Sequence, residues 1–227
     1  MIWAFLRCST ISPPVAEFRC PGVSRFPAHI PYGFIVGQLS MFSAETDEPS
    51  VDDLAGLLAS AGQTTIGSRG ARVSVVVADD WRAQALADEM ERCGLTPEVS
   101  VSSEGSPLVG TATTWALEPL HRAWTKGAIK TMPATWVPSP RALRLWVIAA
   151  GQRDVDRYLL GLDPHTPESH GALATAVMRA GVAPTLVGTR GAAPALRIAG
   201  KRRLTRLIES VGEAPDIPGA AACWPFI

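Results

Sequence analysis

An internal repeat is the feature that most limits how this chain can fold. The segments 91–99 and 178–186, which read ERCGLTPEV and MRAGVAPTL, place Gly94 and Gly181 at an offset of 87 residues. The same offset joins apolar residues further along the chain: Leu117 with Leu204 and Leu120 with Leu207. A repeat of this length indicates a duplicated structural unit whose copies bury apolar surface against each other.

Each copy contains the same order of periodic segments. Helices are expected at 54–62, 81–93 and 116–124, and again at 143–151, 168–180 and 201–211. Strands are expected at 71–78, 98–102 and 108–113, and again at 156–162, 185–187 and 195–199. Glycines end two helices of each copy, at 62, 94, 151 and 181. The order α-β-α-β-β-α, present twice, predicts an α+β protein with helices on one face of each sheet.

The two copies leave an arm, a linker and a tail. We expect a flexible arm over 1–49, a first half over 50–130, a linker over 131–140, a second half over 141–214 and a tail over 215–227. Residues 1–40 hold four of the six Phe and one acid, Glu17, and prolines interrupt any helix there. Two interpretations fit: a proline-rich disordered arm, or an upstream start site that adds 1–35, with the natural start near Val36 or Met41.

Composition excludes several classes of protein. Lys plus Arg and Asp plus Glu both number 21, so the chain has no basic excess of the kind that drives tail-mediated DNA binding. No run of 18 uncharged apolar residues exists to span a membrane, and the four cysteines lie far apart, unlike a disulfide framework or a zinc site. We expect a cytoplasmic protein without a metal or another cofactor.

A short motif lies at the end of the arm. Residues 37–43 read GQLSMFS, and Gln38, Leu39, Ser40, Met41 and Phe42 resemble the peptide that binds the bacterial DNA sliding clamp. The resemblance implies that the apolar side chains fill a groove on the clamp while Gln38 forms a hydrogen bond at its rim. A linker that matches by chance is the alternative, and a start at Met41 would remove the motif.

The two apolar helices carry a second resemblance. Residues 53–62 read DLAGLLASAG, and with 143–151, LRLWVIAAG, they resemble the paired signature helices of the LAGLIDADG homing endonucleases. The strand at 72–80 and the link WTKGAIK at 124–130 fit the same pattern, and the resemblance covers roughly 50–214. It implies a monomer built as an internal pseudo-dimer, whose two sheets form a saddle-shaped surface for double-stranded DNA.

The catalytic acids of that family are missing. The penultimate residue of each signature helix, which ligates a divalent metal in the family, is Ala61 in the first half and Ala150 in the second. A methyl group cannot bind Mg²⁺, so the resemblance implies a DNA-binding fold without nuclease activity. A residual nuclease would need relocated acids, and Asp52 with Asp53 or Asp154 with Asp156 are the nearest carboxylates.

Basic residues on the expected sheets and loops are the candidates for DNA contact. They are Arg69, Arg72, Lys126, Lys130, Arg190, Arg197 and Lys201, the last followed by Arg202 and Arg203. Such a local face would neutralise phosphates without overall basicity; ordinary solvated charge is the alternative. We expect a catalytically inactive DNA-binding protein, recruited to the sliding clamp in replication or repair and associated with the nucleoid. A transcriptional regulator using the same saddle, or a protein-interaction scaffold, remains open.

Overall fold

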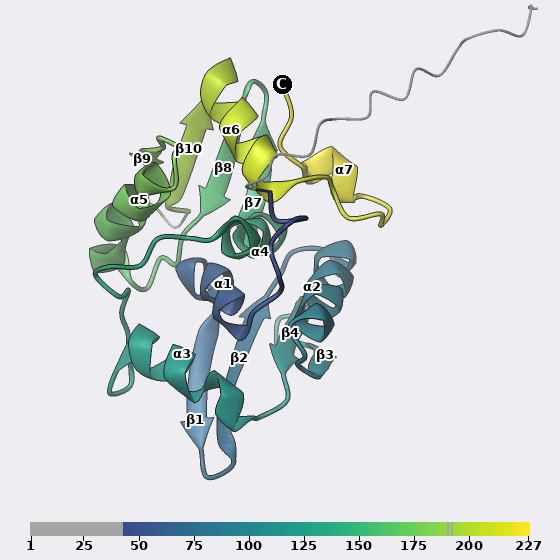
Figure 1. Ribbon diagram of the computed structural model, residues 1–227, viewed down its shortest axis with the longest axis vertical. Coiled ribbons are helices and arrows are strands. Elements are labelled where there is room, and N and C mark those ends of the chain that lie inside the picture. Colours follow the sequence, from purple (N-terminus) through teal and green to yellow (C-terminus); the bar gives the residue numbers. More distant parts are fainter. Residues whose placement is uncertain (1–42, 190, 192) are drawn as a thin grey trace, which may run out of the picture. The chain divides into compact units, whose positions relative to one another are not determined.

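The fold repeats one unit twice around a central pair of helices. The structure is a computed structural model that describes residues 43–189, 191 and 193–227. All that follows concerns the described residues, which belong to the unit Gln38–Ile227. Figure 1 shows its two four-stranded sheets, one in each half, together with their helices.

The first half runs from a 3₁₀ turn to a terminal helix. Its elements are η1 (Val51–Leu54), α1 (Ala55–Ala59), β1 (Gln63–Gly67), β2 (Gly70–Val76), α2 (Asp80–Arg92), β3 (Pro97–Val101), β4 (Pro107–Thr111), η2 (Trp115–Leu117) and α3 (Glu118–Trp124). A capping box begins it: the Ser50 side chain accepts from the helix backbone, and Asp53 accepts from the Ser50 N–H. A short hairpin of β5 (Thr125–Lys126) and β6 (Ile129–Lys130) follows.

The second half repeats this order. It contains α4 (Pro140–Ala150), β7 (Gly151–Asp154), β8 (Arg157–Gly161), η3 (Pro167–Ser169), α5 (His170–Arg179), β9 (Thr185–Val187), β10 (Ala195–Ala199) and α6 (Lys201–Val211), and α7 (Ala220–Cys223) follows it. Ser139 caps α4 and Pro140 occupies the first helical turn, where a missing N–H costs nothing. None of the helices in the described residues is long and apolar enough to cross a membrane.

Both sheets are antiparallel and have the same strand order, β1-β2-β4-β3 and β7-β8-β10-β9. The α+β class and the duplication are therefore confirmed. The expected order within each half was wrong by one strand, because β1 and β7 were missed. The segment QTTIG of β1 is mostly exposed and GQRD of β7 is polar, so neither shows the apolar pattern of a strand.

The 87-residue offset holds in three dimensions. Residues at this offset are buried in both halves, as in the pairs Leu86 and Leu173, Met90 and Val177, Val109 and Leu196, and Leu117 and Leu204. In β2 the buried residues alternate with half-buried Arg72 and Ser74. Each sheet therefore buries one face under its own helices and leaves the other face open.

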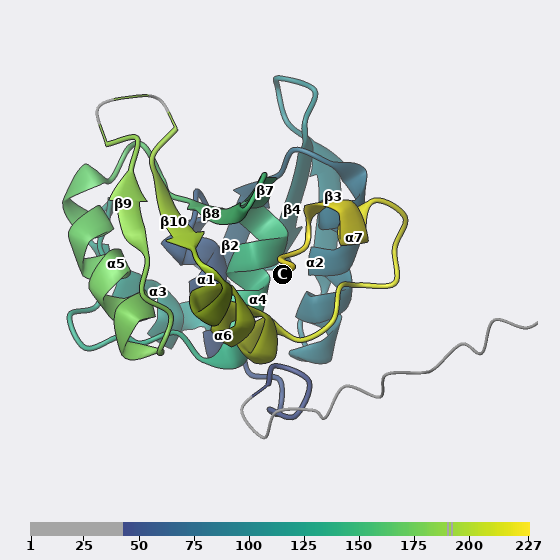
Figure 2. The ribbon, with the colours of Figure 1, turned by 90° about the horizontal axis from the view of Figure 1, so that it is seen from above.

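The halves meet where α1 and α4 pack against each other. Figure 2 shows these two helices side by side between the sheets. Gly56 makes the contact possible, because a Cβ at this position would lie 2.8 Å from the carbonyl carbon of Ala142 and closer still to its oxygen. All residues of α1 are buried, as are Ala142 to Ala149 of α4.

A buried ionic network fastens the other end of α4. The Glu89 carboxylate on α2 accepts from Arg141 at 2.6 Å and from Arg144 at 3.0 Å. Arg141 also forms an ion pair with Asp53 at 3.3 Å. These side chains join η1, α2 and α4, so the network ties both halves together, and removing one partner would leave a buried charge unpaired.

The ends of the described chain pack on this body. Ala44 is buried, donates its N–H to the Ser210 carbonyl and accepts from Arg141. Ala44, which the sequence analysis assigned to the flexible arm over 1–49, is therefore in contact with the folded body. The residues of the expected tail also contact the folded body, because Trp224 is buried and its indole N–H donates to the Gly212 carbonyl, while the Tyr158 hydroxyl donates to the Cys223 carbonyl.

The contact at Gly56 yields a stability prediction. We expect Gly56→Ala to lower the free energy of unfolding by about 1–3 kcal/mol, because the added methyl must push α1 away from α4. Gly171→Ala is the matched control: it lies in α5 with open space around its Cα, and it should raise stability by about 0.5 kcal/mol. Urea denaturation of both variants measures the difference, and equal midpoints would contradict the close contact.

Candidate nucleic-acid interface

The open face of the first sheet carries polar side chains around one arginine. The strand register places Arg72 and Ser74 of β2 beside Thr65 and Gln63 of β1. Gly110 of β4 has no side chain, and the Arg72 guanidinium lies over it, 3.0 Å from where a Cβ would be. Across Gly110, Arg72 forms a half-exposed ion pair with Glu98 at 3.6 Å.

The open face of the second sheet has an arginine at the corresponding place. Arg197 of β10 pairs with Leu159 of β8 on one side and with Thr185 of β9 on the other. By the 87-residue offset Arg197 corresponds to Gly110. In the first sheet the Arg72 guanidinium lies over Gly110 of β4, and in the second sheet Arg197 is itself a residue of β10. Both β4 and β10 are third in the spatial order of their sheet, so each open face has a cation near its third strand.

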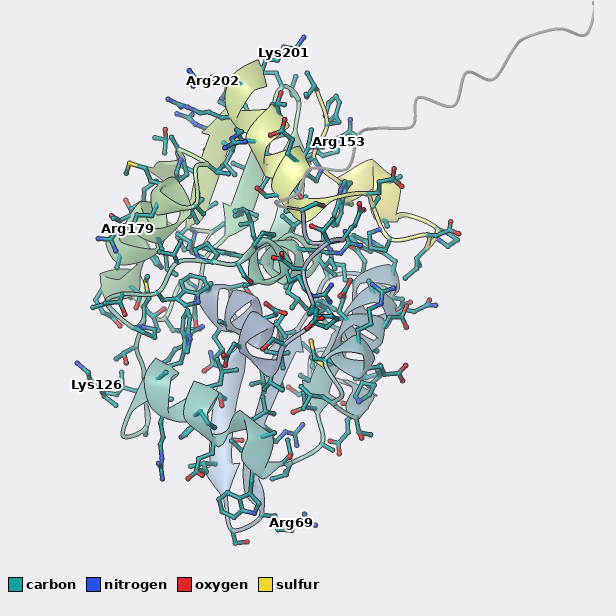
Figure 3. The ribbon with its side chains drawn as sticks, viewed as in Figure 1. Arg69, Lys126, Arg153, Arg179, Lys201 and Arg202 are labelled. Carbon is teal, nitrogen blue, oxygen red and sulfur yellow. The ribbon has the colours of Figure 1, made fainter. Side chains whose placement is uncertain are left out.

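The other predicted contacts lie on separate elements. Arg69 is exposed in the β1–β2 turn and Lys126 in the β5–β6 hairpin. Lys201, with Arg202 and Arg203, begins α6, a helix that packs against α4 and β10 through Leu204 and Leu207. Figure 3 shows Arg69, Lys126 and Lys201 well apart from one another. Only Arg72 and Arg197 of the set lie on open sheet faces; Arg190 lies outside the described residues.

The structure does not support Lys130 as a DNA contact, because its side chain is buried and already bound. Its side chain is 10% exposed, and its Nζ lies 2.6 Å from the Ser60 carbonyl, 2.8 Å from the Gly62 carbonyl and 2.9 Å from Asp163. These three acceptors use all three N–H groups of an ammonium. Lys130 therefore caps the carboxyl end of α1 and has no donor left for a phosphate.

Burial and pairing act on the pKa of both partners. Burial lowers the pKa of Lys130, against the opposing effect of Asp163. Burial alone would raise the pKa of Asp163, but hydrogen bonds from Lys130, the His165 N–H and Gln63 hold it below its ordinary value. The lowered pKa of Lys130 disfavours its charged form, whereas the lowered pKa of Asp163 favours the charged carboxylate. The short contacts decide for the charged form, since only an ammonium can donate to all three acceptors.

The carboxyl end of α4 is capped in a similar way. The Arg82 guanidinium on α2 donates to the carbonyls of Ile148 at 2.6 Å and Gly151 at 2.7 Å, and Asp79 accepts from its Nε at 2.9 Å. Asp79 and Asp163 both follow the second strand of their half. A buried cation therefore binds the carboxyl end of each central helix and forms an ion pair with a carboxylate: Lys130 with Asp163 at α1, and Arg82 with Asp79 at α4. A cation at this end also interacts favourably with the helix dipole.

These helix ends do not fit a divalent metal. Ala61 and Ala150 offer only methyl groups, and the neighbouring backbone carbonyls already accept from Lys130 and Arg82. Within the part of the chain that the structure describes, no group of three His, Cys, Asp or Glu side chains could hold a metal. Asp53 cannot act as a relocated ligand here, since it lies before α1 and binds Ser50, Ser139 and Arg141.

Sequence reasoning missed three kinds of residue at this interface. Gln63 and Gln152 begin the two strands that were not predicted, each directly after the glycine that ends a central helix. This equivalent position in both copies of the repeat could have indicated the two strands. Arg157 also lies on the open face, beside Asp154. Arg82 had no signal, because its acceptors are backbone carbonyls 65 to 69 residues away.

Comparisons with known proteins agree on the fold. No family model and no curated protein sequence matches the chain. The N-terminal LAGLIDADG domain of DUF199/WhiA has a similar structure, with a TM-score of 0.50 and 11% identity over 75% of this chain and 84% of that one. The homing endonuclease I-WcaI bound to its DNA recognition sequence gives a TM-score of 0.49 and 11% identity, with the same coverage. The chain has a LAGLIDADG-like fold, as the signature helices predicted.

The cap on α1 is open to a direct test. We expect Lys130→Met to lower the free energy of unfolding by about 3 kcal/mol, because it leaves Asp163 and two helix carbonyls buried without their donor. Lys126→Met, an exposed lysine of the same hairpin, should change it by less than about 0.5 kcal/mol. Thermal and urea unfolding of both variants measure these values, and similar stabilities would contradict the cap.

The same pair predicts a pH dependence. The pKa of Asp163 is lowered from 3.8 in the folded state, so its stabilising effect is complete above that pH and is lost as the pH falls through the folded value. The advantage of wild type over Lys130→Met should therefore shrink on acidification. Unfolding measured between neutral and acidic pH checks this, and an advantage that grows below pH 3.8 would contradict the pairing.

Proposed function

We propose that this protein binds duplex DNA across the open faces of its two sheets and does not cleave it. The observation that carries the proposal is the pair of open faces, each with a guanidinium near its third strand, from Arg72 and from Arg197. Arginine is suited to phosphate oxygens because its planar fork donates two parallel hydrogen bonds. The solved I-WcaI complex, which contains a DNA recognition sequence, supports nucleic acid as the ligand class of this fold.

Uncharged polar residues complete the proposed surface. Thr65 on β1, Ser74 on β2 and Gln152 on β7 lie on the same open faces as the arginines, near Gln63, whose amide donates to Asp163. Amide and hydroxyl groups both donate and accept, as contacts to base edges in the major groove require. Phosphate contacts by Arg72 and Arg197 would then supply affinity, while these residues would supply what sequence preference the protein has.

The helix ends support binding without hydrolysis. In a nuclease of this fold a metal at these ends would activate water and stabilise the leaving oxygen. Here Lys130 and Arg82 take the backbone acceptors, and Ala61 and Ala150 have no oxygen to offer. Exchanging acids for alanines and covering the carbonyls with fixed cations gives stable helix ends in place of metal ligands.

The DNA proposal predicts a specific salt dependence. Full-length protein should bind a labelled duplex with an affinity that falls as salt rises, and Arg72→Ala combined with Arg197→Ala should weaken binding about tenfold and reduce the log–log salt slope by about 2. Arg122→Ala with Arg179→Ala removes the same charge from α3 and α5, away from the open faces, and should leave binding unchanged. Fluorescence anisotropy measures all three proteins.

Two outcomes would count against this proposal. Equal losses in the two double variants would mean that total charge, and not the open faces, determines binding. Strand cleavage on a denaturing gel with Mg²⁺ or Mn²⁺ would contradict the absence of nuclease activity, whatever the affinity.

We also propose that residues Gln38 to Phe42 recruit the protein to the bacterial DNA sliding clamp. The support is the sequence motif, which lies outside the described residues, together with its position two residues before buried Ala44. In sequence, the motif directly precedes the part of the chain that contacts α6 through Ala44.

A pulldown on purified clamp tests the recruitment. Full-length wild type should be retained, and Gln38→Ala combined with Phe42→Ala should lose most of that retention, because both the rim hydrogen bond and the apolar anchor are removed. Phe34→Ala, an aromatic substitution outside the motif, is the matched control and should be retained like wild type. Equal retention of all three proteins would identify the motif as a chance match.

A further inference from the structure

Two adjoining cavities on the helix side of the second half share one arginine. The first, of about 330 Å³, lies between the linker and α6 and is lined by Pro138, Leu143 and Ala180 opposite Arg206. The second, of about 370 Å³, lies between α6 and the loop after α5 and includes Arg202, Arg203 and again Arg206. Arg206 therefore separates an apolar cavity from a basic one.

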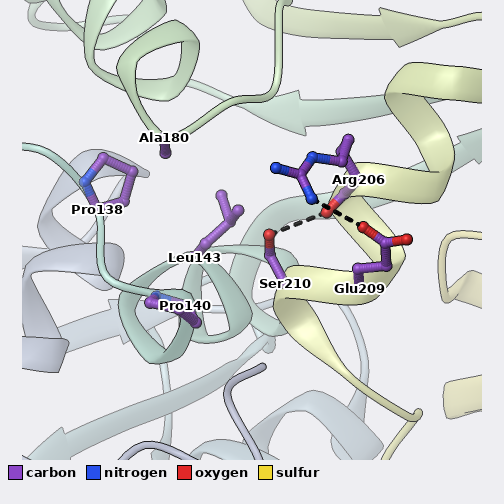
Figure 4. A pocket seen from close by; sticks show the side chains of 7 residues that line it. All are labelled: Pro138, Pro140, Leu143, Ala180, Arg206, Glu209 and Ser210. Carbon is purple, nitrogen blue, oxygen red and sulfur yellow. Dashed lines mark hydrogen bonds and ion pairs between the residues drawn. The ribbon is translucent and has the colours of Figure 1, made fainter. Parts of the chain in front are cut away.

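The apolar cavity has one polar wall. Figure 4 shows Pro138, Pro140, Leu143 and Ala180 on one side and α6 on the other, from which the Arg206 guanidinium extends toward Ala180 and Leu143. Arg206 is held by Glu209 at 3.1 Å, and the Ser210 hydroxyl donates to the Arg206 carbonyl. A flat apolar body that fits here would lie on proline and leucine and meet a carboxylate and a hydroxyl at its polar edge.

The basic cavity concentrates charge that the rest of α6 does not balance. Arg202, Arg203 and Arg206 are all exposed, and Glu209 pairs with Arg206. Gly181 at its border has no side chain, and a Cβ there would lie 3.9 Å from the Arg206 guanidinium. The loop at Gly181 and the three arginines together border this cavity. Three guanidinium groups around one small cavity match the oxygens of a phosphate.

We propose that the two cavities together bind a nucleoside phosphate, with the phosphate against Arg202, Arg203 and Arg206 and the base against Pro138 and Leu143. Each half of such a ligand matches one cavity, and the volumes suit a small molecule of this class. Arg206 touches both parts and Glu209 can accept from the amino group of a base. The nucleotide is either free or the 5′ end of a strand, since both present the same chemistry.

This site is separate from the proposed DNA surface. Arg202, Arg203 and Arg206 belong to α6, which packs on α4 and β10, whereas Arg72 and Arg197 lie on the open sheet faces. The inference therefore does not depend on duplex binding, and its failure would leave that proposal untouched.

Isothermal titration of the full-length protein with ATP, AMP, adenosine and inorganic phosphate tests the site. ATP and AMP should bind at least about tenfold more tightly than phosphate or adenosine, because only they fill both cavities. Arg206→Ala should weaken ATP binding about tenfold, and Arg202→Ala with Arg203→Ala at least as much. Arg122→Ala is the matched control: Arg122 is also exposed and also pairs within its helix, with Glu118, but it borders neither cavity.

Several results would overturn the nucleotide site. ATP binding that is equal in wild type and Arg206→Ala, or absent in wild type at millimolar ligand, would overturn the site. Phosphate that binds as well as ATP would also overturn it, since the apolar cavity would then contribute nothing. Displacement of ATP by a 5′-phosphorylated oligonucleotide, and not by its unphosphorylated form, would support the site with a strand end as the ligand; displacement by neither would support a free nucleotide. Circular dichroism melting of each variant confirms that it is folded.

Discussion

The close packing of α1 against α4 is the constraint on which the rest of the structure depends. Each helix connects directly to the first strand of its sheet, so the distance between the helices fixes the distance between the two open faces. Gly56 permits this distance because any side chain would collide with the Ala142 carbonyl. A change of one methyl group at this crossing would therefore alter both the stability of the core and the spacing of Arg72 and Arg197.

Both central helices also end in the interior, which creates an electrostatic problem. Unpaired carbonyls and the negative end of each helix dipole would be costly in a partly buried place. In a metal-dependent nuclease bound cations would offset this cost. Here the cations are covalently part of the chain: Lys130, held by Asp163, and Arg82, held by Asp79. Arg82 reaches from the first half to α4 of the second, so the cap is also a contact between the halves.

Contacts between residues that lie far apart in the sequence explain where prediction from the sequence succeeded and where it failed. The duplication and most helix and strand positions were predictable, because burial recurs at a fixed offset, as at Val109 and Leu196. The first strand of each sheet was not, since an exposed edge strand such as QTTIG lacks a buried face to impose a pattern. The sequence also predicted Lys130 to be a surface cation. Its burial depends on Asp163 and on the end of α1, and neither is adjacent to Lys130 in the sequence.

Burial of charge also changes what the neutral composition means for binding. Arg82, Arg141 and Arg144 are buried together with the ammonium of Lys130, and they meet Asp53, Glu89, Asp163 and several backbone carbonyls in the interior. The cations that remain outside are fewer than the sequence suggests, and on the open faces Arg72 already shares its charge with Glu98. A DNA contact here cannot rest on a broad positive field. The proposed contact rests instead on arginines at defined positions on two sheets whose separation the central helices fix.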